Sequence, residues 1–537
     1  MSIIQVSNLS FSYPGSYTPV FEGLDFTFDS RWRLGLVGRN GRGKTTLLKL
    51  LSGALQGSGR MVSNLQFDYF PFPVDESRPA LDCMKQAVAP FEQWEREMDE
   101  LIRQGSEQAL LRWGELQQQY ALSDGYIIED LLKAEADKMR VDPGELNRPL
   151  NSFSPGQRTR LLLAAMFLRK NRFLLIDEPT NHLDAPGRQA AANYLRGKQG
   201  FILVSHDRWF LDQTVDHIAA LEKTALRIEQ GNYSSYRENK ALRDAFEIEQ
   251  NQKLKTEINR LQQTAMEKAS WSNAVESTKI GNGPTDRGRI GHLAAKAMKR
   301  SLTIQTRIDR KIEEKQGLLK DLEYASALSL HPLTHPAKVL WRLHQASAGY
   351  DGRPVFEGLT LELQQGMHLN VTGPNGAGKS TFLKLITGEL PLLGGQMTRA
   401  SGLIISQMPQ QAQDLAGTPQ SLARREGLDE SYFLMLLRKL DFPREAFERD
   451  MSGYSMGQRK KVLLAAAMAK PAHVYIWDEP LNYLDLESRE QVEEMLAQCP
   501  ATLIFVEHDQ RFVERVASHI LDVRRGTVLE APTASMG

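Results

Sequence analysis

The chain has 537 residues, of which 41% are hydrophobic and 25% are charged. This composition is that of an ordinary globular protein with about three or four domains. Lysines plus arginines number 66 and acidic residues also 66, so the zero net charge excludes a whole-chain polycation but leaves local basic patches open. The two cysteines, Cys83 and Cys499, are too few for a disulfide framework or a cysteine metal cluster.

Apolar runs along the chain are too short to form a membrane domain. The longest, at residues 161–168 and 462–469, are far shorter than the roughly 20 residues that a spanning helix needs. The first residues, MSIIQVSNLS, lack the basic and apolar regions of a signal peptide. We therefore expect a cytoplasmic protein that cannot form a transmembrane pathway by itself.

Four landmarks occur twice along the chain, in the same order. They are PVFEGL (19–24 and 354–359), a glycine-rich loop (GRNGRGKT, 38–45; GPNGAGKS, 373–380), a DEP segment (LLIDEPTNHLD, 174–184; YIWDEPLNYLD, 475–485) and a histidine segment (FILVSHDRWFL, 201–211; LIFVEHDQRFV, 503–513). Such internal similarity indicates two homologous domains in tandem. We place these α/β domains at residues 1–232 and 337–537.

The first copy is longer than the second between its glycine-rich loop and its DEP segment. The surplus falls at about residues 81–140, where apolar residues recur every three or four positions among Glu, Gln and Arg. This spacing predicts an inserted helical pair. A solvated decoration and an arm that docks on a partner are both compatible with the pattern.

Residues 233–336, between the two copies, have no strand-like pattern. Two long stretches rich in Lys, Glu and Gln flank a segment whose helix-breaking residues are Gly281, Gly283, Pro284, Gly288 and Gly291. The pattern predicts an antiparallel α-helical hairpin linker with a glycine-rich tip. At 1.5 Å per residue, each arm would reach about 45 Å.

Positive charge is concentrated near the predicted tip of this hairpin. Residues 268–300 contain seven basic residues and two acidic ones. A basic tip on a projection favours binding to a phosphate backbone, and the solvated end of a coiled coil is the alternative. Trp271, beside the tip, would stack on a base or serve as a packing residue.

Each glycine-rich loop matches the phosphate-loop pattern GxxxxGK[ST] between an apolar strand and a helix. Glycines let backbone N–H groups wrap phosphates, and the helix N-terminus favours their charge. We expect ATP and Mg²⁺ as cofactors, with Lys44 and Lys379 reaching the phosphates and Thr45 and Ser380 holding the metal. The other loop residues expected to line the nucleotide are Gly38, Arg39, Asn40, Gly41, Arg42, Gly43 and Thr46, then Gly373, Pro374, Asn375, Gly376, Ala377, Gly378 and Thr381.

The Asp-Glu pair of each DEP segment follows an apolar strand. Asp177 and Asp478 come at the strand end, where an aspartate can bind Mg²⁺ through water. Glu178 and Glu479 come next, where a carboxylate can orient or deprotonate a water that attacks the γ-phosphate. These residues predict a phosphoanhydride hydrolase with a general base in both copies.

Two further elements accompany each DEP segment. His206 and His508 follow the next strand and are predicted to contact the γ-phosphate, with a structural role in a turn as the alternative. FSPGQ (153–157) and YSMGQ (454–458) precede the DEP segments by about 20 residues and are variants of the LSGGQ signature. With the D-loops at 181–184 and 482–485, the full set resembles the ATP-binding cassette superfamily over nearly the whole chain.

Two fused cassettes, no membrane span and a charged helical linker make the chain resemble the ABC-F family, whose members bind the ribosome and act in translation or protect it from antibiotics. The resemblance implies an intramolecular cassette dimer in a monomeric chain, with two ATP molecules sandwiched head to tail. The phosphate loop of the first cassette would face Ser455, Gly457 and Gln458, and that of the second would face Ser154, Gly156 and Gln157.

The resemblance also assigns the remaining contacts with the cofactors. Tyr13 and Tyr350 would stack on adenine, and Gln407 would contact Mg²⁺ in the second cassette. The matching stretch of the first cassette, FDYFPF, has Tyr69 in place of that glutamine, which puts its metal coordination in doubt. Pro155 and Met456 replace the first glycine of the signature.

The expected function is that of an ABC-F ATPase. In its ATP-bound closed state it would bind the ribosome, through ribosomal RNA and with transfer RNA as a further contact, and would insert the linker toward the peptidyl-transferase centre. Hydrolysis would release it. The long linker and the YFPF stretch favour the branch that protects ribosomes from lincosamide, pleuromutilin and streptogramin A antibiotics over a housekeeping translation factor.

Two alternatives from other classes fit less well. The ATPase subunit of a membrane transporter leaves the basic hairpin unexplained. A DNA-repair or chromosome ATPase of the superfamily would carry zinc cysteines or far longer coils than this sequence contains.

Overall fold

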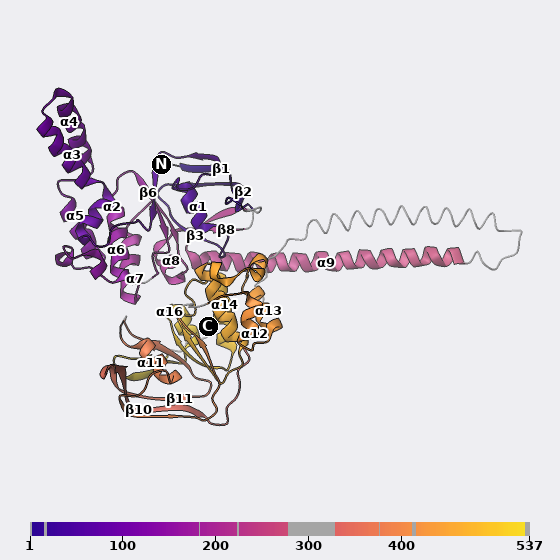
Figure 1. Cartoon of the computed structure of the whole chain (residues 1–537). Coiled ribbons are helices and arrows are strands. Elements are labelled where there is room, and N and C mark those ends of the chain that lie inside the picture. Colours follow the sequence, from indigo (N-terminus) through magenta and orange to yellow (C-terminus); the bar gives the residue numbers. More distant parts are fainter. Residues whose placement is uncertain are drawn as a thin grey trace, which may run out of the picture. The chain divides into compact units, whose positions relative to one another are not determined.

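The computed structural model describes residues 3–15, 19–181, 183–222, 225–277, 328–374, 376–410, 415–507 and 509–531. The chain divides into two compact units (Figure 1). One comprises Met1–Ser234 and Ala325–Gly537 and contains both cassettes, and the other comprises Ser235–Tyr324.

The first cassette is built from nine strands and a set of helices. The strands are β1 (Ile3–Phe11), β2 (Phe21–Asp29), β3 (Arg33–Val37), β4 (Ser58–Val62), β5 (Gln66–Phe70), β6 (Arg172–Asp177), β7 (Phe201–Val204), β8 (His217–Leu221) and β9 (Leu226–Gln230). The α-helices are α1 (Lys44–Leu51), α2 (Ala80–Val88), α3 (Phe91–Gln104), α4 (Glu107–Leu122), α5 (Ile128–Lys138), α6 (Pro155–Met166), α7 (Ala185–Arg196) and α8 (Arg208–Thr214), with 3₁₀ turns at Pro143–Glu145 and Leu150–Ser152.

The second cassette repeats this plan. Its strands are β10 (Val339–Tyr350), β11 (Arg353–Gln364), β12 (His368–Thr372), β13 (Gly394–Arg399), β14 (Ile405–Met408), β15 (Val474–Asp478), β16 (Thr502–Val506), β17 (His519–Asp522) and β18 (Thr527–Glu530). Its α-helices are α11 (Lys379–Thr387), α12 (Pro419–Arg425), α13 (Glu430–Lys439), α14 (Met456–Ala469), α15 (Leu486–Gln498) and α16 (Gln510–Val516), with 3₁₀ turns at Arg444–Glu448 and Met451–Gly453.

Each cassette contains a six-stranded sheet and a three-stranded antiparallel sheet. The large sheets have the orders β5-β6-β7-β3-β8-β9 and β14-β15-β16-β12-β17-β18, in which only the last strand is antiparallel. The small sheets are β2-β1-β4 and β11-β10-β13. Parallel strands are covered on both faces, which explains why β7 (FILV) and β16 (TLIFV) are buried at every position. The predicted pair of tandem α/β cassettes is confirmed.

The insertion in the first cassette is helical. Helices α3 and α4 lie side by side as a pair (Figure 1, indigo). Phe91, at the start of α3, is buried and packs edge-on against Trp94 and Tyr120. Aromatic contacts of this kind hold the base of the pair together.

The predicted hairpin linker is described only in part. Helix α9 (Tyr233–Ser277) runs without a break for 45 residues (Figure 1, pink). The second arm, the glycine-rich segment and most of the basic tip lie outside the described residues, so the hairpin and its charge remain predictions.

Candidate functional site

The order of strands brings the separate motifs of each copy together. In the large sheet of the first cassette, β6, β7 and β3 are neighbours and parallel. The phosphate loop follows β3, Asp177 ends β6, and His206 follows β7. Because the carboxyl ends of parallel strands meet at one edge, these residues face one crevice. The same holds for β15, β16 and β12 in the second cassette.

The two phosphate loops have the same backbone geometry. Gly43 and Gly378 precede α1 and α11 with φ angles of 92° and 98°, in the left-handed region that favours glycine. A Cβ atom at Gly43 would lie 2.6 Å from a methyl carbon of Val20, so a side chain has no room there. The glycines therefore let each loop turn into the start of its helix, where backbone N–H groups point at an anion.

The lysine of each loop crosses the loop and donates to its backbone. The Lys44 ammonium donates to the carbonyl oxygens of Gly38 (2.7 Å) and Arg39 (3.3 Å). The Lys379 ammonium donates to the equivalent carbonyls at 2.8 and 3.2 Å. Burial lowers the pKa of both lysines, and nearby carboxylates oppose that shift. A phosphate group is the kind of anion that such buried cations accommodate.

A cavity of about 330 Å³ lies over the first phosphate loop. We call it the Lys44 site, and we call the corresponding residues of the second cassette, Lys379, Asp478 and Glu479, the Lys379 site. Ten of the residues predicted from the sequence line the cavity: Tyr13, Asn40, Gly41, Gly43, Lys44, Thr45, Thr46, Asp177, Glu178 and His206.

Glu178 has unusual backbone and charge properties. Its φ of 51° and that of Glu479, 49°, are rare for residues other than glycine, and such strain is concentrated at functional positions. Burial raises the pKa of Glu178 to about 8, with Lys44 opposing the shift. Burial lowers the pKa of His206, whose Nε2 lies 3.3 Å from Glu178 Oε1. Burial thus disfavours the charged form of each of these two side chains.

Unsatisfied polar atoms mark the Lys44 site as a place for a polar ligand. Glu178 Oε1 and His206 Nδ1 are buried and have no hydrogen-bond partner. Buried polar groups are normally paired, so these two atoms fit a site that takes up phosphate and water. The donor set fits a nucleotide, and Thr45 beside Asp177 fits Mg²⁺, which prefers one or two protein oxygens together with phosphate oxygens.

Glu479, which corresponds to Glu178 in the Lys379 site, has different neighbours from those of Glu178. Glu479 Oε2 accepts hydrogen bonds from Asn482 Nδ2 (2.6 Å) and from Gln410 Nε2 (2.8 Å). Burial and the charge of Glu479 raise the pKa of Asp478 to about 6, and Ser380 hydrogen-bonds to Asp478. His508 and Asn375 lie outside the described residues, so their roles remain predictions.

The glutamine that reaches the second carboxylate is Gln410, which the sequence analysis missed. Gln407 lies in β14, paired with Ile476 of β15, and its role as a metal contact remains a prediction. Gln410 could have been found from the motif MPQ, which begins at Met408, the last residue of β14. Its position in the first copy is taken by Phe72 of YFPF, and the Gln407 position by Tyr69.

Tyr69, at the position of the missing glutamine, contacts Asp177, the aspartate predicted to bind the metal. Its hydroxyl donates to Asp177 Oδ2 at 2.9 Å. Burial, followed by the charge of Asp177, raises the pKa of Tyr69, so the hydroxyl keeps its proton and remains a donor. The first cassette thus fixes Asp177 with a phenol.

The two signature motifs begin helices and have closed capping boxes. Ser154 and Gln157 cap α6, and Ser455 and Gln458 cap α14, each with reciprocal bonds between serine and glutamine. Pro155 occupies the first helical position, where its lack of an N–H costs nothing. The sequence change at Pro155 therefore leaves the cap intact.

The signature and D-loop of the second cassette contact the first phosphate loop. Asn40 Nδ2 donates to the carbonyl oxygen of Tyr483 (3.0 Å), and it lies 3.1 Å from where a Cβ of Gly457 would be. Asp485 acts electrostatically on Lys44, and Asp184 acts on Lys379. Each lysine is thus close to the D-loop aspartate of the other cassette, as expected for a head-to-tail pair.

Three other residues predicted to contact nucleotide, Arg39, Tyr13 and Tyr350, each contact protein side chains. Arg39 forms ion pairs with Glu487 and with Asp441 (3.3 Å) of the second cassette. The hydroxyls of Tyr13 and Thr46 share a hydrogen bond of 2.8 Å. The Lys384 ammonium lies 5.7 Å from the ring centroid of Tyr350. Both tyrosine rings are exposed enough to stack on a base.

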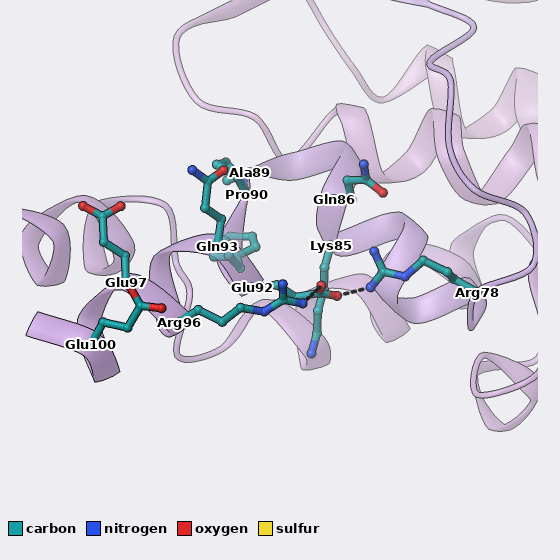
Figure 2. A pocket seen from close by; sticks show the side chains of 11 residues that line it. Arg78, Lys85, Gln86, Ala89, Pro90, Glu92, Gln93, Arg96, Glu97 and Glu100 are labelled. Carbon is teal, nitrogen blue, oxygen red and sulfur yellow. Dashed lines mark hydrogen bonds and ion pairs between the residues drawn. The ribbon is translucent and has the colours of Figure 1, made fainter. Parts of the chain in front are cut away.

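A larger cavity, of about 580 Å³, lies between α2 and the start of α3, away from the phosphate loops. In Figure 2, Glu92 lies between Arg78 and Arg96 and forms ion pairs with both. Lys85 pairs with Glu129 of α5. These internal pairs hold the base of the helical insertion together, and the cavity contains no arrangement comparable to the phosphate loops.

Comparison with known proteins decides the family. The sequence profile described as "ABC transporter" matches residues 21–181 and 356–482, more than half of the chain. The chain belongs to the ABC transporter family. None of the helices in the described ranges combines the length and apolar character that a membrane crossing requires.

Two curated relatives and one solved structure illustrate the similarity. "Ribosome protection protein VmlR" of Bacillus subtilis is 32% identical over 69% of this chain and 68% of its own length. "Energy-dependent translational throttle protein EttA" of Mycobacterium tuberculosis is 25% identical over 94% of this chain and 88% of its own. The crystal structure of an archaeal ribosome recycling factor, aABCE1, with a ribosomal stalk protein matches with a TM-score of 0.55 and 19% identity, over 96% of this chain and 86% of that chain. That likeness confirms the fold.

Proposed function

We propose that this ABC transporter family member is an ABC-F ATPase of the ribosome. The observation that carries the proposal is the pairing of two cassettes within one chain, in which the phosphate loop at Lys44 meets the D-loop at Tyr483 of the other cassette. A chain that builds its own nucleotide sandwich needs no second copy to close. The names of the relatives, a ribosome protection protein and a translational throttle, support the ribosome as the partner.

The residues of each site would divide the work of hydrolysis. Lys44 and Lys379 would neutralise phosphate charge, and the serines that begin α14 and α6 would donate to the γ-phosphate from the opposite cassette. Mg²⁺, held by Thr45 with Asp177 and by Ser380 with Asp478, would supply charge neutralisation. Glu178 and Glu479 would accept a proton from the attacking water, with His206 and His508 fixing the γ-phosphate.

Closure would then be coupled to the linker that joins the two cassettes. Phosphate contacts made by both halves would favour the closed state, and their loss after hydrolysis would release it. The closed state would bind the ribosome with the basic segment at residues 268–300 directed toward the peptidyl-transferase centre. Protection from lincosamide, pleuromutilin and streptogramin A drugs is the favoured outcome, and a housekeeping role in translation is the alternative.

A variant that binds ATP without cleaving it tests this proposal. We expect the double variant Glu178→Gln, Glu479→Gln to sediment with ribosomes in the presence of ATP and to arrest translation in a cell-free system. The matched control, Lys44→Ala with Lys379→Ala, removes the phosphate contact and should stay at the top of the gradient. Capture of the glutamine variant by membranes and not by ribosomes would instead favour a transporter subunit.

Drug protection is tested separately. Cells that express the wild-type chain should grow at higher concentrations of at least one of the three drug classes than cells that express the Lys44→Ala, Lys379→Ala control. Unchanged inhibitory concentrations combined with ribosome binding would favour the housekeeping role.

A further inference from the structure

Helix α15 of the second cassette presents an acidic face to the first cassette. Its residues Glu487, Glu490 and Glu493 are spaced by three, so they lie along one side of the helix. Glu487 pairs with Arg39 and Glu493 pairs with Arg208, both of the first cassette, and Glu490 accepts from the hydroxyl of Tyr233 (3.0 Å), the first residue of α9. We call these three contacts the α15 clasp.

The clasp includes a pair of deeply buried charges. The side chains of Arg208 and Glu493 are 7% and 4% exposed, and Asp509 lies 3.8 Å from the same guanidinium. Glu493 also pairs with Arg515 of its own cassette (3.0 Å), so opening would break the contacts of Arg208 with Glu493 and Asp509. Because these contacts must break before water can solvate the charges, they slow the separation of the two cassettes. Next to it, Arg511 pairs with Asp212 (2.6 Å) and donates to Ser234 (2.9 Å).

The clasp ends in the phosphate loop of the Lys44 site. Arg39 belongs to that loop, and its neighbour Asn40 donates to the D-loop carbonyl of Tyr483. The loop that surrounds Lys44 is therefore tied to the second cassette by protein side chains alone. None of these contacts involves a nucleotide atom.

The other half of the molecule carries no charges at the equivalent positions. We aligned the two copies at their D-loop aspartates, Asp184 and Asp485. In this alignment the three glutamates of α15 correspond to Pro186, Gln189 and Ala192 of α7. Likewise Arg39 corresponds to Pro374 in the second phosphate loop, and Arg208 corresponds to Gln510. Neither side of the clasp can therefore form at the Lys379 site.

We propose that the α15 clasp keeps the Lys44 site assembled whether or not nucleotide is bound, so that nucleotide enters and leaves mainly through the Lys379 site. This inference rests on the proposed function in that both sites take ATP. It gives the two sites different roles: the Lys44 site retains its nucleotide, and the Lys379 site opens to exchange nucleotide.

Release of a fluorescent ADP analogue from one site at a time tests the proposal. Lys379→Ala leaves only the Lys44 site competent, and Lys44→Ala leaves only the Lys379 site. We expect release from the Lys44 site to be slower by about tenfold or more, because it requires the clasp to open. Adding Glu487→Gln and Glu490→Gln should accelerate release about fivefold or more from the Lys44 site and leave the Lys379 site unchanged.

The same helix offers a matched control. Glu494 is next to Glu493 but exposed, so Glu494→Gln removes one charge from α15 without touching the clasp. We expect Glu494→Gln to release nucleotide from both sites at the wild-type rates. Equal release from the two sites in the wild-type background, or equal acceleration of both by the double glutamine change, would overturn the proposal.

Amide hydrogen exchange in the nucleotide-free chain separates this inference from the proposed function. We expect α15 to exchange more slowly than its counterpart α7, and the Glu487→Gln, Glu490→Gln variant to lose that difference while Glu494→Gln keeps it. Equal exchange of α15 and α7 in the wild type would disprove the clasp. A chain that binds no ATP but keeps this protection would disprove the proposed function and leave the clasp standing.

Discussion

The Lys44 and Lys379 sites share the phosphate loop, the Asp-Glu pair and the signature but differ in what surrounds these motifs. Each lysine donates to the two equivalent carbonyls of its own loop, and Glu178 and Glu479 both have a left-handed backbone. The first loop is tied to the second cassette through Arg39 and Asn40, whereas the second loop has Pro374 in place of that arginine. The two copies therefore keep the same residues within each short motif. They differ in the residues that bind each phosphate loop to the opposite cassette.

The carboxylates of the two sites are also held in different ways. Glu178 lies beside the imidazole of His206, and its partner aspartate is held by the phenol of Tyr69. Glu479 is held by two amides, Asn482 and Gln410. Amide donors stabilise an ionised carboxylate, whereas a buried neutral imidazole does so less. The two carboxylates are therefore positioned by different kinds of neighbour.

Steady-state ATP hydrolysis provides the largest expected difference. If nucleotide exchanges mainly at the Lys379 site, Lys379→Ala should lower turnover by more than about tenfold, whereas Lys44→Ala should lower it by about threefold, because a retained nucleotide turns over rarely. Phosphate release measured under saturating ATP checks this. Equal losses in the two variants would break the distinction between the sites.

Loss of the buried clasp pair should destabilise the chain. Arg208→Ala leaves Glu493 buried and paired only with Arg515 (3.0 Å), which costs about 3 kcal/mol for a broken buried ion pair. The equivalent residue of the second cassette, Gln510, is exposed, so Gln510→Ala should cost less than about 0.5 kcal/mol. Urea denaturation followed by circular dichroism compares them, and similar midpoints would argue against the pair as a structural element.

The D-loop aspartate at the clasped site should confer a characteristic pH dependence. Burial alone would raise the pKa of Asp485, but Lys461, at 2.8 Å, lowers it below its ordinary value of 3.8. A carboxylate with a depressed pKa contributes its stability at all pH values above its unfolded pKa and loses it as the pH falls through the folded pKa. Asp485→Asn should thus lower the free energy of unfolding by about 3 kcal/mol between pH 7 and pH 5. The difference between wild type and variant should become smaller only below about pH 4.

Unfolding free energies at several pH values test this expectation. The half-buried counterpart Asp184 provides the comparison, and Asp184→Asn should cost less at every pH. A cost for Asp485→Asn that already declines between pH 7 and pH 5 would contradict the pairing with Lys461.

The smallest expected effect concerns the metal at the Lys44 site. Tyr69→Phe removes one hydrogen bond to Asp177, worth about 1 kcal/mol, and should weaken Mg²⁺ binding about fivefold in the Lys379→Ala background. Tyr120→Phe removes an equivalent hydroxyl, which donates to Glu95 in the helical insertion, and should have no effect. Magnesium titration of bound fluorescent ADP measures both, and equal affinities would show that Tyr69 does not position the aspartate.

The candidate site motifs could be recognised in the sequence because each is contiguous. Phosphate loops, Asp-Glu pairs and signatures need particular residues within a few positions, so Lys44, Glu178 and Ser455 could be assigned without a structure. The pairing of the two copies was implied by the family resemblance. The contact between Asn40 and Tyr483 confirms that the first loop faces the second cassette.

Contacts between distant residues were missed because charge alone does not reveal a partner. Glu487, Glu490 and Glu493 are typical of a solvated helix face, and Arg39 in a phosphate loop suggests a nucleotide contact. A comparison of α15 with α7 could have drawn attention to these positions, because only one copy carries the glutamates. Gln410 was overlooked because Gln407, three residues earlier, was assigned as the glutamine of this stretch. Gln407 aligns with Tyr69 of the first copy, and Gln410 aligns with Phe72.

The central claim, that the two sites are unequal and that the clasped one retains its nucleotide, is tested most directly by isolating the chain after loading with a photoreactive ATP analogue and rapid gel filtration. We predict about one nucleotide retained per chain, cross-linked after illumination to peptides of the first phosphate loop at residues 38–46. Retention divided equally between that loop and residues 373–381 would contradict the account.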